Sequence, residues 1–388
     1  MFLKFLRKIP LAWLQVTREK NRLVVALAGI AFADILMFVQ LGFMESLYEA
    51  AIKPHQALQG DLFMINPQFE TLFSVKSFAR ERLIQTAGFE QVASVRSLYI
   101  ATGQWRNPET RIDRPILVFG ADPAQPIFDL PEVNQQLDSL KQLHRVVFDQ
   151  AGRPEYGEIA TLLQQTTPLP VQVNRLDMQV AGVFTLGASF AADGNVITSD
   201  STFLRLFPDR RPDRIDVGLI HLKPGVDRQQ AQAALQAHLS DDVLVLTLEE
   251  FANREKAYWA SSTPIGFVFG FGTIIGFIVG IVIVYQILYT DVSDHLPEYA
   301  TLKAMGYSDF YLVGVLAQEA LILAILGFIP GSLLSIGLYH LAQTATMLPI
   351  GITLNRALLV LTLTITMCVG SGAIAMRKLQ SADPADIF

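Results

Sequence analysis

The stretch Ile265–Leu288 reads IGFVFGFGTIIGFIVGIVIVYQIL and contains no charged side chain. At about 1.5 Å of rise per helical residue, it is long enough to cross a hydrocarbon core of about 30 Å. Its apolar residues do not alternate with polar ones as in a barrel strand, so the stretch indicates a transmembrane helix. Three further stretches of this kind predict four spans in all, at residues 23–44, 264–289, 310–339 and 357–376.

The composition indicates a membrane protein with a large water-soluble part. A mean hydropathy of +0.36 is high for a soluble protein, whereas 17% charged residues are too many for a chain that lies wholly in a membrane. The water-soluble part is the insert at residues 45–263, between the first two spans. The only cysteine, Cys368, falls in the fourth span, so the insert should fold without a disulfide.

Basic residues orient the four spans. They gather just before the first span and just after the last, and the positive-inside rule places such short flanks in the cytoplasm. The residues concerned are Lys4, Arg7, Lys8, Arg18, Lys20, Arg22, Arg377 and Lys378. We therefore expect a multi-pass protein of the cell inner (plasma) membrane with both termini cytoplasmic. Residues 45–263 and the short loop 340–356 should lie outside, and residues 290–309 and the tail 377–388 inside.

The insert shows a strand and helix pattern twice, which predicts an α/β domain. The fold class is therefore an α-helical membrane domain of four transmembrane helices plus a large extracytoplasmic α/β domain. Residues 45–128 and 187–263 are expected to form one discontinuous subdomain, with residues 129–186 inserted as a second. The expected strands are 61–65, 92–102, 171–173, 178–184, 215–222 and 243–247, and the expected helical runs are 75–86, 131–148 and 227–239.

Residues 1–22 are predicted to form an amphipathic helix on the cytoplasmic membrane surface. Phe2, Phe5 and Ile9 recur at helical spacing, with basic residues elsewhere. An ordinary basic leader explains the pattern equally well, so both interpretations stay open.

A short helix is predicted between the second and third spans. Asp294 suits its N-cap, Pro297 and Glu298 suit its first turn, and Gly306 suits the residue just past its end. The helix has a broad apolar side, formed by Leu296, Tyr299, Leu302 and Met305. These apolar side chains should be covered by another surface, either the membrane or a partner protein.

Motifs of enzymes are lacking. The sequence contains no G-x-x-x-x-G-K-[ST] loop, so the chain itself should bind no ATP. Its histidines show no paired metal-ligand spacing, and Gly187–Ala191 only half resembles a nucleophile elbow. We therefore expect no enzyme activity, no metal and no cofactor in this chain.

Two carboxylates interrupt the spans, Asp34 in the first and Glu319 in the third. An ionised group in the bilayer costs about 3 kcal/mol or more, so each must face water or a partner. A proton relay or a substrate contact is one interpretation. We favour the simpler one, an interhelical hydrogen bond to Gln40, Gln286 or Gln318.

Glycine recurs along the second span. The positions are Gly266, Gly270, Gly272, Gly276 and Gly280, and they include G-x-x-x-G pairs. Small residues let helices approach closely, so the pattern predicts a packing face, either within the chain or between two copies of it.

These features together resemble the MacB/FtsX-type permeases of the type VII ABC transporter superfamily. The most specific stretch is Glu298–Gly306, EYATLKAMG, which is similar to the family signature E-x-x-x-L-[RK]-A-[LM]-G; Glu319-Ala320 and Asp383–Asp386 are similar to later family motifs. The resemblance implies mechanotransmission, in which the short helix receives the motion of a separate ATPase that binds ATP and Mg. The coupling residues would be Leu296, Pro297, Glu298, Leu302, Lys303, Met305 and Gly306.

Within this family, Leu296–Tyr299 and Asp383–Phe388 look most like the DevC subgroup, the permeases of the cyanobacterial heterocyst glycolipid exporter. Typical relatives carry a basic cluster before the glutamate, where this chain has Asp291, Asp294 and His295. The resemblance implies a homodimer in contact with membrane lipids, a DevA-like ABC ATPase, a DevB-like periplasmic adaptor and a TolC-like outer-membrane protein. It also implies efflux of an amphiphile such as a glycolipid. No basic patch suggests a nucleic acid partner.

Adaptor or substrate contacts are expected on the insert. Its segment 182–200 carries Phe184 and Phe190 among glycine and alanine residues, and it is the candidate docking or gating loop, although a plain surface loop fits as well. The rival function is an FtsX-like permease that signals to a cell-wall hydrolase. The size of the insert favours the exporter, because two subdomains fit in it.

Overall fold

A computed structural model describes residue 13 and residues 19–189 and 192–381. The chain divides into two compact units. We call residues 1–46 and 264–388 the helical unit, and Leu47–Thr263 the α/β unit. The predicted amphipathic helix at residues 1–22 lies mostly outside the described residues.

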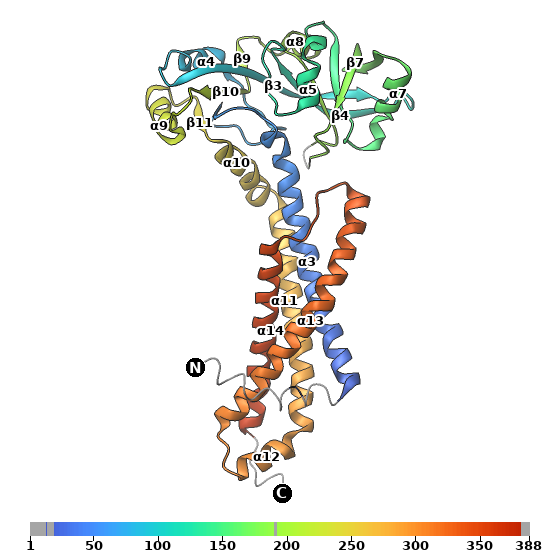
Figure 1. Cartoon of the computed structure of the whole chain (residues 1–388), viewed down its shortest axis with the longest axis vertical. Coiled ribbons are helices and arrows are strands. Elements are labelled where there is room, and N and C mark those ends of the chain that lie inside the picture. Colours follow the sequence, from blue (N-terminus) through green and yellow to red (C-terminus); the bar gives the residue numbers. More distant parts are fainter. Residues whose placement is uncertain (1–12, 14–18, 190–191, 382–388) are drawn as a thin grey trace. The chain divides into compact units, whose positions relative to one another are not determined.

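Among its described residues, the helical unit has four helices that are long and apolar enough to cross a membrane, which confirms the four predicted spans (Figure 1). They are α3 (Lys20–Gln56), α11 (Pro264–Asp294), α13 (Asp309–Thr346) and α14 (Leu354–Ser381). A short helix, α12 (Leu296–Ala304), joins α11 to α13. Helix α3 outlasts the predicted span and includes residues of both units.

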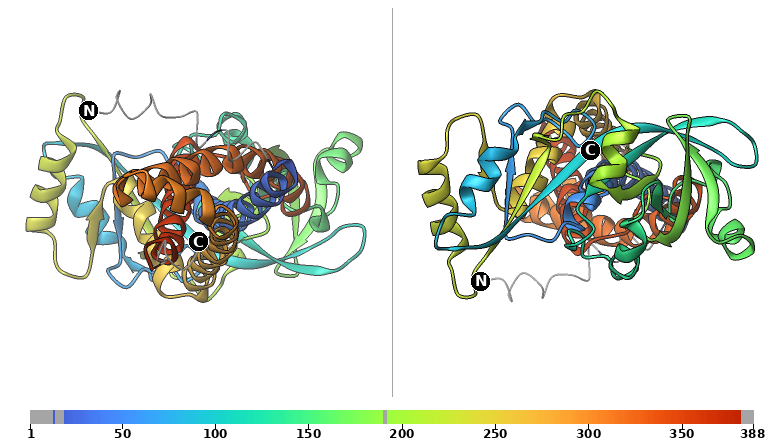
Figure 2. Two further views of the ribbon diagram at one scale, coloured as in Figure 1. Left: turned by 90° about the horizontal axis from the view of Figure 1, so that it is seen from below. Right: turned by 90° about the horizontal axis from the view of Figure 1, so that it is seen from above.

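Within this unit, α14 packs against α11 and α13, and the views along the bundle in Figure 2 show the four helices side by side. The buried interior is mostly apolar and includes Ile30, Val284, Leu323 and Met367. Large apolar side chains also cover the outside, among them Phe267 and Leu333, at 71% and 63% exposure. A bundle that is apolar both inside and outside suits lipid as its solvent.

The α/β unit is built on one mixed sheet of nine strands, in the order β11-β1-β10-β3-β4-β8-β5-β7-β6. Only the pairs β4–β8 and β5–β7 are parallel. The strands are β1 (Leu62–Ile65), β3 (Val92–Arg106), β4 (Asp113–Ala121), β5 (Arg145–Asp149), β6 (Leu169–Val173), β7 (Leu176–Phe184), β8 (Asn195–Ser199), β10 (Val217–Leu222) and β11 (Leu244–Leu246). A separate pair consists of β2 (Phe78–Ala79) and β9 (Arg214–Ile215).

Both faces of this sheet are covered. Along β1, Leu62 and Met64 belong to one apolar cluster, whereas Phe63 and Ile65 belong to the other, because successive strand residues point to opposite faces. The covering helices are α4 (Arg80–Thr86), α5 (Pro131–Gln135), α6 (Leu137–Leu140), α7 (Ile159–Gln165), α8 (Asp200–Leu206), α9 (Arg228–His238) and α10 (Leu248–Ser261).

Two predicted helical runs are wrong in part. The run at 75–86 begins only at Arg80, because Phe78 and Ala79 pair with Ile215 and Arg214 as strands. The run at 131–148 ends at Leu140, and residues 145–149 form β5 between β7 and β8. The side chains of β5 are buried on both faces of the sheet, and this tertiary burial overrides the helical pattern.

The expected subdomain boundaries stay a prediction. Strands of the middle segment, β5, β6 and β7, gather at one end of the sheet, and β1, β10 and β11 at the other. The long strands β3 and β4 join the two ends, so one hydrogen-bonded sheet runs through residues on both sides of each boundary.

Candidate functional site

The helix that would couple this chain to an ATPase is present as α12, and its end is defined by Gly306. That residue has a φ of +90°, in the left-handed region, where a side chain is strained. The N–H of Tyr307 donates to the C=O of Leu302 at 3.1 Å, which closes the last turn. The predicted role of Gly306 as the residue just past the helix end is therefore confirmed.

An exposed apolar surface follows α12. It consists of Met305, Tyr307 and Phe310, at 63%, 45% and 88% exposure, and we call it the coupling surface. Leu296 and Leu302 are half-buried, and the side chains of Tyr299 and Lys303 lie outside the described residues. Contiguous exposed apolar residues mark protein or membrane contacts, so this turn is suited to meet a partner.

Asp294 does not act as the predicted N-cap of α12. It is the last residue of α11, and its carboxylate accepts a hydrogen bond from the guanidinium of Arg22 near the start of α3. Arg22 also pairs with Glu19, at 2.9 Å. Pro297 and Glu298 do lie in the first turn of α12, as predicted. The start of the short helix is thus tied to α3 by an ion pair that local sequence rules cannot foresee.

Asp34 is fully buried, and its partner is Thr364 of α14. The Thr364 hydroxyl lies 2.6 Å from the Asp34 Oδ1 atom and donates to it. Because hydroxyl side chains hydrogen-bond across membrane helices, this contact joins α3 to α14. The interhelical bond was expected, but not with this residue; no described contact joins Asp34 to any of the three glutamines.

Glu319 lies beside another carboxyl group. It is 3% exposed, and it lines one small cavity together with Asp291 of α11. Asp291 also faces His295, at 3.9 Å. The expectation of a glutamine partner for Glu319 is therefore replaced by a carboxyl pair. The sequence signal was Asp291 itself, a carboxylate near the end of the second span.

Some of the glycines of α11 pack against α3 within the chain. A Cβ atom at Gly276 would lie 3.2 Å from the Leu36 Cβ atom, and one at Gly280 would meet Met367 and, at 2.8 Å, Ala33. Gly272 faces the side chain of Gln40 in the same way. A Cβ atom at Gly270 would meet nothing within 4 Å, and Gly266 is half-buried. Three of the five glycines thus serve intramolecular packing, and a dimer interface stays a prediction.

A second polar contact between helices was not predicted from the sequence. Arg356 at the start of α14 is 5% exposed, and its Nε atom donates to Glu45 of α3 at 3.0 Å. Its Nη1 atom donates to the C=O of Gly351 at 2.7 Å, and the guanidinium lies over the Tyr339 ring, at 5.6 Å. The available signal was the isolated arginine at the end of the span opposite the basic tail.

A buried acid and a buried histidine meet in the α/β unit. Glu255 of α10 lies 3.6 Å from His55 at the end of α3. Burial raises the pKa of Glu255 to about 7, although hydrogen bonds from the Trp259 ring and the N–H of Leu72 favour the ionised form. The contact links the helix that enters the α/β unit with the helix that leaves it.

The candidate docking loop is held by one carboxylate. Asp149 is fully buried and accepts hydrogen bonds from the N–H groups of Leu186 and Gly187, at 3.0 and 2.9 Å, and from the Asn195 side chain at 2.8 Å. Burial raises the pKa of Asp149, and these bonds oppose the shift. Phe184 is the buried last residue of β7 and belongs to the core, so it is not an exposed docking residue; Phe190 lies outside the described residues.

Two family models together cover most of the chain. The model described as MacB-like periplasmic core domain matches residues 23–238, more than half of the sequence. The model described as FtsX-like permease C-terminal matches residues 267–384. The second match begins close to the start of α11, and the first begins within α3.

Among solved structures, the chain is similar to the periplasmic region of MacB from Actinobacillus actinomycetemcomitans, at 13% identity and a TM-score of 0.35. This likeness covers 51% of the present chain and 92% of that one. It is also similar to the extracellular domain of the noncanonic ABC-type transporter YknZ from Gram-positive bacteria, at 16% identity and a TM-score of 0.33, over 48% and 99% of the two chains. No curated protein matches the sequence.

Proposed function

The chain belongs to the MacB/FtsX-type family of ABC transporter permeases, and we propose that it is the permease subunit of a tripartite exporter. It is a multi-pass protein of the inner membrane with a MacB-like periplasmic domain. Permeases of this family are typically non-catalytic and work with an ABC ATPase. In the proposed exporter, ATP and Mg bind to that partner chain.

The coupling surface is the observation that carries the proposal. It exposes Met305, Tyr307 and Phe310 at the turn between α12 and α13, where apolar side chains gain from being covered. Helix α12 itself sits between α11 and α13 in the chain. A push on α12 is therefore delivered directly to two membrane helices, and α11 packs in turn on α3 through its glycines.

The contacts at the far ends of these helices support transmission to the α/β unit. Helix α3 continues without a break from Lys20 to Gln56, and only Ser262 and Thr263 separate α10 from α11. Within the α/β unit, His55 near the end of α3 lies 3.6 Å from Glu255 of α10. A long helix is stiff, so a displacement at its cytoplasmic end reaches its other end.

The proposed assembly is a homodimer with both termini in the cytoplasm and residues 45–263 in the periplasm. It binds a DevA-like ATPase at the coupling surface and a DevB-like adaptor at the α/β unit, and the adaptor leads to a TolC-like duct. The cargo is an amphiphile such as a glycolipid. Mechanotransmission moves it outward by closing the α/β units, without a polar path through the helices.

Co-purification of the tagged full chain from its native membrane, after mild crosslinking, tests this proposal. An ABC ATPase together with an adaptor and an outer-membrane duct is the expected result. Purified ATPase added to the chain in nanodiscs should then hydrolyse ATP faster than with empty nanodiscs. An ATPase together with a cell-wall hydrolase, and without an adaptor, would instead establish the FtsX-like signalling function. Absence of any ATPase would overturn both.

A further inference from the structure

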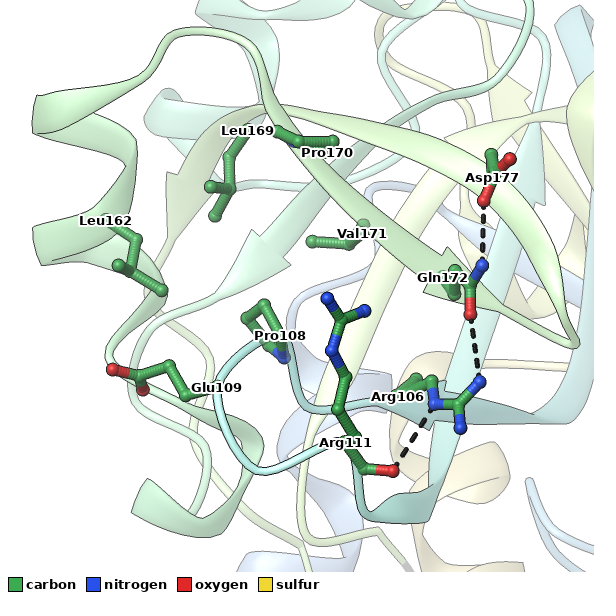
Figure 3. Close-up of a pocket in the computed structure, with 10 residues that line it drawn as sticks. All are labelled: Arg106, Pro108, Glu109, Arg111, Leu162, Leu169, Pro170, Val171, Gln172 and Asp177. Carbon is green, nitrogen blue, oxygen red and sulfur yellow. Dashed lines mark hydrogen bonds between the residues drawn. The ribbon is translucent and has the colours of Figure 1, made fainter.

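A cavity of about 370 Å³ lies in the α/β unit beside the tips of two hairpins (Figure 3). Its walls come from the β3–β4 hairpin around residues 106–111, from β6 and the start of β7, and from α7. A second cavity, of about 390 Å³, adjoins it and shares Arg106 and Gln172. Small-molecule sites typically have volumes of about 300–1,000 Å³, so either cavity is large enough for a ligand.

The cavity has one apolar wall and one cationic wall. Pro108, Leu162, Leu169 and Val171 form the apolar wall. Two arginines face it, and Figure 3 shows the Arg111 side chain in the middle of the lining residues, with its guanidinium directed toward Val171. Apolar area beside a few placed polar groups is the usual make-up of a ligand site.

Arg111 is a lining cation for which the described residues supply no acceptor. Arg106 donates to the Gln172 side chain and to the Arg111 C=O, each at 3.3 Å, and it lies 3.7 Å from Asp113. The guanidinium of Arg111, in contrast, makes no hydrogen bond or ion pair within the described part of the chain. A guanidinium presents its donors in a planar fork that matches the oxygens of a carboxylate or a phosphate.

The carboxylates at the cavity rim already have donors. Asp177 accepts from the Gln172 Nε2 atom at 2.9 Å, and Glu109 accepts from the N–H of Glu158 at 3.4 Å. In Figure 3 both carboxylates stand at opposite edges of the cavity, away from the Arg111 guanidinium. The centre of the cavity is therefore cationic although its rim carries both signs.

The loop that carries Arg111 is fixed before any ligand arrives. Asn107 is 3% exposed, its Oδ1 atom accepts from the N–H groups of Glu109 and Thr110 at 2.8 and 3.0 Å, and its Nδ2 atom donates to the C=O of Glu155 at 2.9 Å. Arg111 has a φ of +60°. A ligand that binds here does not have to order the backbone, which favours affinity.

We propose that this cavity binds an anionic amphiphile. The Arg111 guanidinium pairs with a phosphate, sulfate or carboxylate head group, and the wall formed by Leu162, Leu169 and Val171 covers the first carbons of the chain. The assignment rests on the proposed function, because it gives a charge class to the amphiphile that the exporter carries. It requires no ATPase, adaptor or duct for binding.

Calorimetric titration of the full chain in nanodiscs tests the site with three probes, against empty nanodiscs as the blank. Hexyl phosphate has both features, inorganic phosphate has only the anion, and hexyl glucoside has only the chain with a neutral head. Hexyl phosphate should bind at least about tenfold more tightly than the other two, since each lost charge-assisted contact or apolar contact costs about a factor of ten.

Variants separate the site from the rest of the protein. Arg111→Gln should weaken hexyl phosphate binding about tenfold, and Leu162→Gln should weaken it while sparing inorganic phosphate. Arg211→Gln, which changes an exposed guanidinium outside both cavities that pairs with Asp213, should leave binding unchanged. Thermal unfolding of each variant checks that the fold is kept.

Equal binding of hexyl glucoside, equal binding of inorganic phosphate, or an unchanged affinity in Arg111→Gln would each overturn the proposal. None of these results would contradict the exporter proposal, because that proposal is tested by which ATPase and adaptor co-purify with the chain. Conversely, loss of ATPase coupling leaves the binding test intact, so the two failures are distinguishable.

Discussion

The Nε2 atom of His55 lies 3.6 Å from the Oε2 atom of Glu255, and both side chains are fully buried. His55 is near the end of the helix that enters the α/β unit, and Glu255 is in the last helix of that unit. The carboxyl group also holds the backbone of Leu72 and the ring of Trp259. One buried acid therefore joins α10 to the backbone at Leu72 and lies beside the end of α3.

The pH dependence of stability should reveal this acid. Burial raises the pKa of Glu255 from its usual 4.5 to about 7, so the folded state binds the proton more tightly. Its contribution is complete below about pH 4.5 and is lost as pH rises through 7, with an upper bound of about 3 kcal/mol. Burial lowers the pKa of the neighbouring His55, which acts in the opposite direction, so the contribution of Glu255 is the difference between the wild type and Glu255→Gln. In thermal unfolding of the full chain in nanodiscs, this difference should shrink as pH rises from about 4.5 to 7. Glu249→Gln, which changes an exposed acid of the same helix, should follow the pH dependence of the wild type.

Asp34→Asn should retain export, because an amide oxygen still accepts the hydrogen bond of Thr364. Thr364→Val removes the donor and should lower the free energy of unfolding by about 1 kcal/mol, in the range of polar contacts between membrane helices. Export by the reconstituted complex and thermal stability of the chain are the two measurements. A stably assembled Asp34→Asn complex that exports nothing would assign the carboxylate to an intramembrane path.

Gly280→Val should prevent α11 from packing on α3 and α14, since the added Cβ atom alone would meet Met367 and Ala33. We expect a loss of about 2 kcal/mol or more, or failure to assemble. Gly270→Val is the matched control in the same helix, because its Cβ atom would meet nothing within 4 Å. Size-exclusion profiles and melting temperatures of the two variants compare them. Equal behaviour would show that α11 and α3 do not pack as described.

Met305→Glu should weaken ATPase binding by tenfold or more, because it places a charge in the coupling surface. Met347 lies at the other end of α13 and is also exposed, at 44% against 63% for Met305. Met347→Glu should therefore leave binding and stimulation of ATP hydrolysis unchanged. ATPase affinity for the chain in nanodiscs is the readout, and an unaltered affinity for Met305→Glu would remove this surface from the coupling mechanism.

Cysteine labelling should show on which side of the membrane the α/β unit and the α12–α13 turn each lie. In a Cys368→Ala background, a cysteine at exposed Ser201 should react with an impermeant maleimide on intact spheroplasts, whereas one at exposed Ser308 should react only after the membrane is opened. Reaction of both from the same side would contradict the proposed orientation, whatever the function.

Local patterns predicted much of this architecture. A transmembrane helix is recognised from the length and apolarity of one segment, so the four long helices could be predicted from the sequence. The end of α12 at Gly306 likewise depends on residues close together in the chain. The strands β1, β3, β7, β10 and β11 carried the β-branched and aromatic runs that favour strands, and each was expected near its observed place. The spacing of glycines in α11 similarly predicted that another helix packs closely against it.

Tertiary structure alone decided which groups meet. Asp34 accepts a hydrogen bond from Thr364 and not from a glutamine, and Glu319 lies beside Asp291. Residues 145–149 form strand β5, although a helix was predicted there. The cavity around Arg111 joins residues of two hairpins and a helix that no local pattern relates. The physical reason is that periodicity and capping are set by neighbours within a few residues. Burial and the choice of contact partner depend instead on how segments far apart in the chain pack together. There, one possible contact differs from another by only about 1 kcal/mol in free energy.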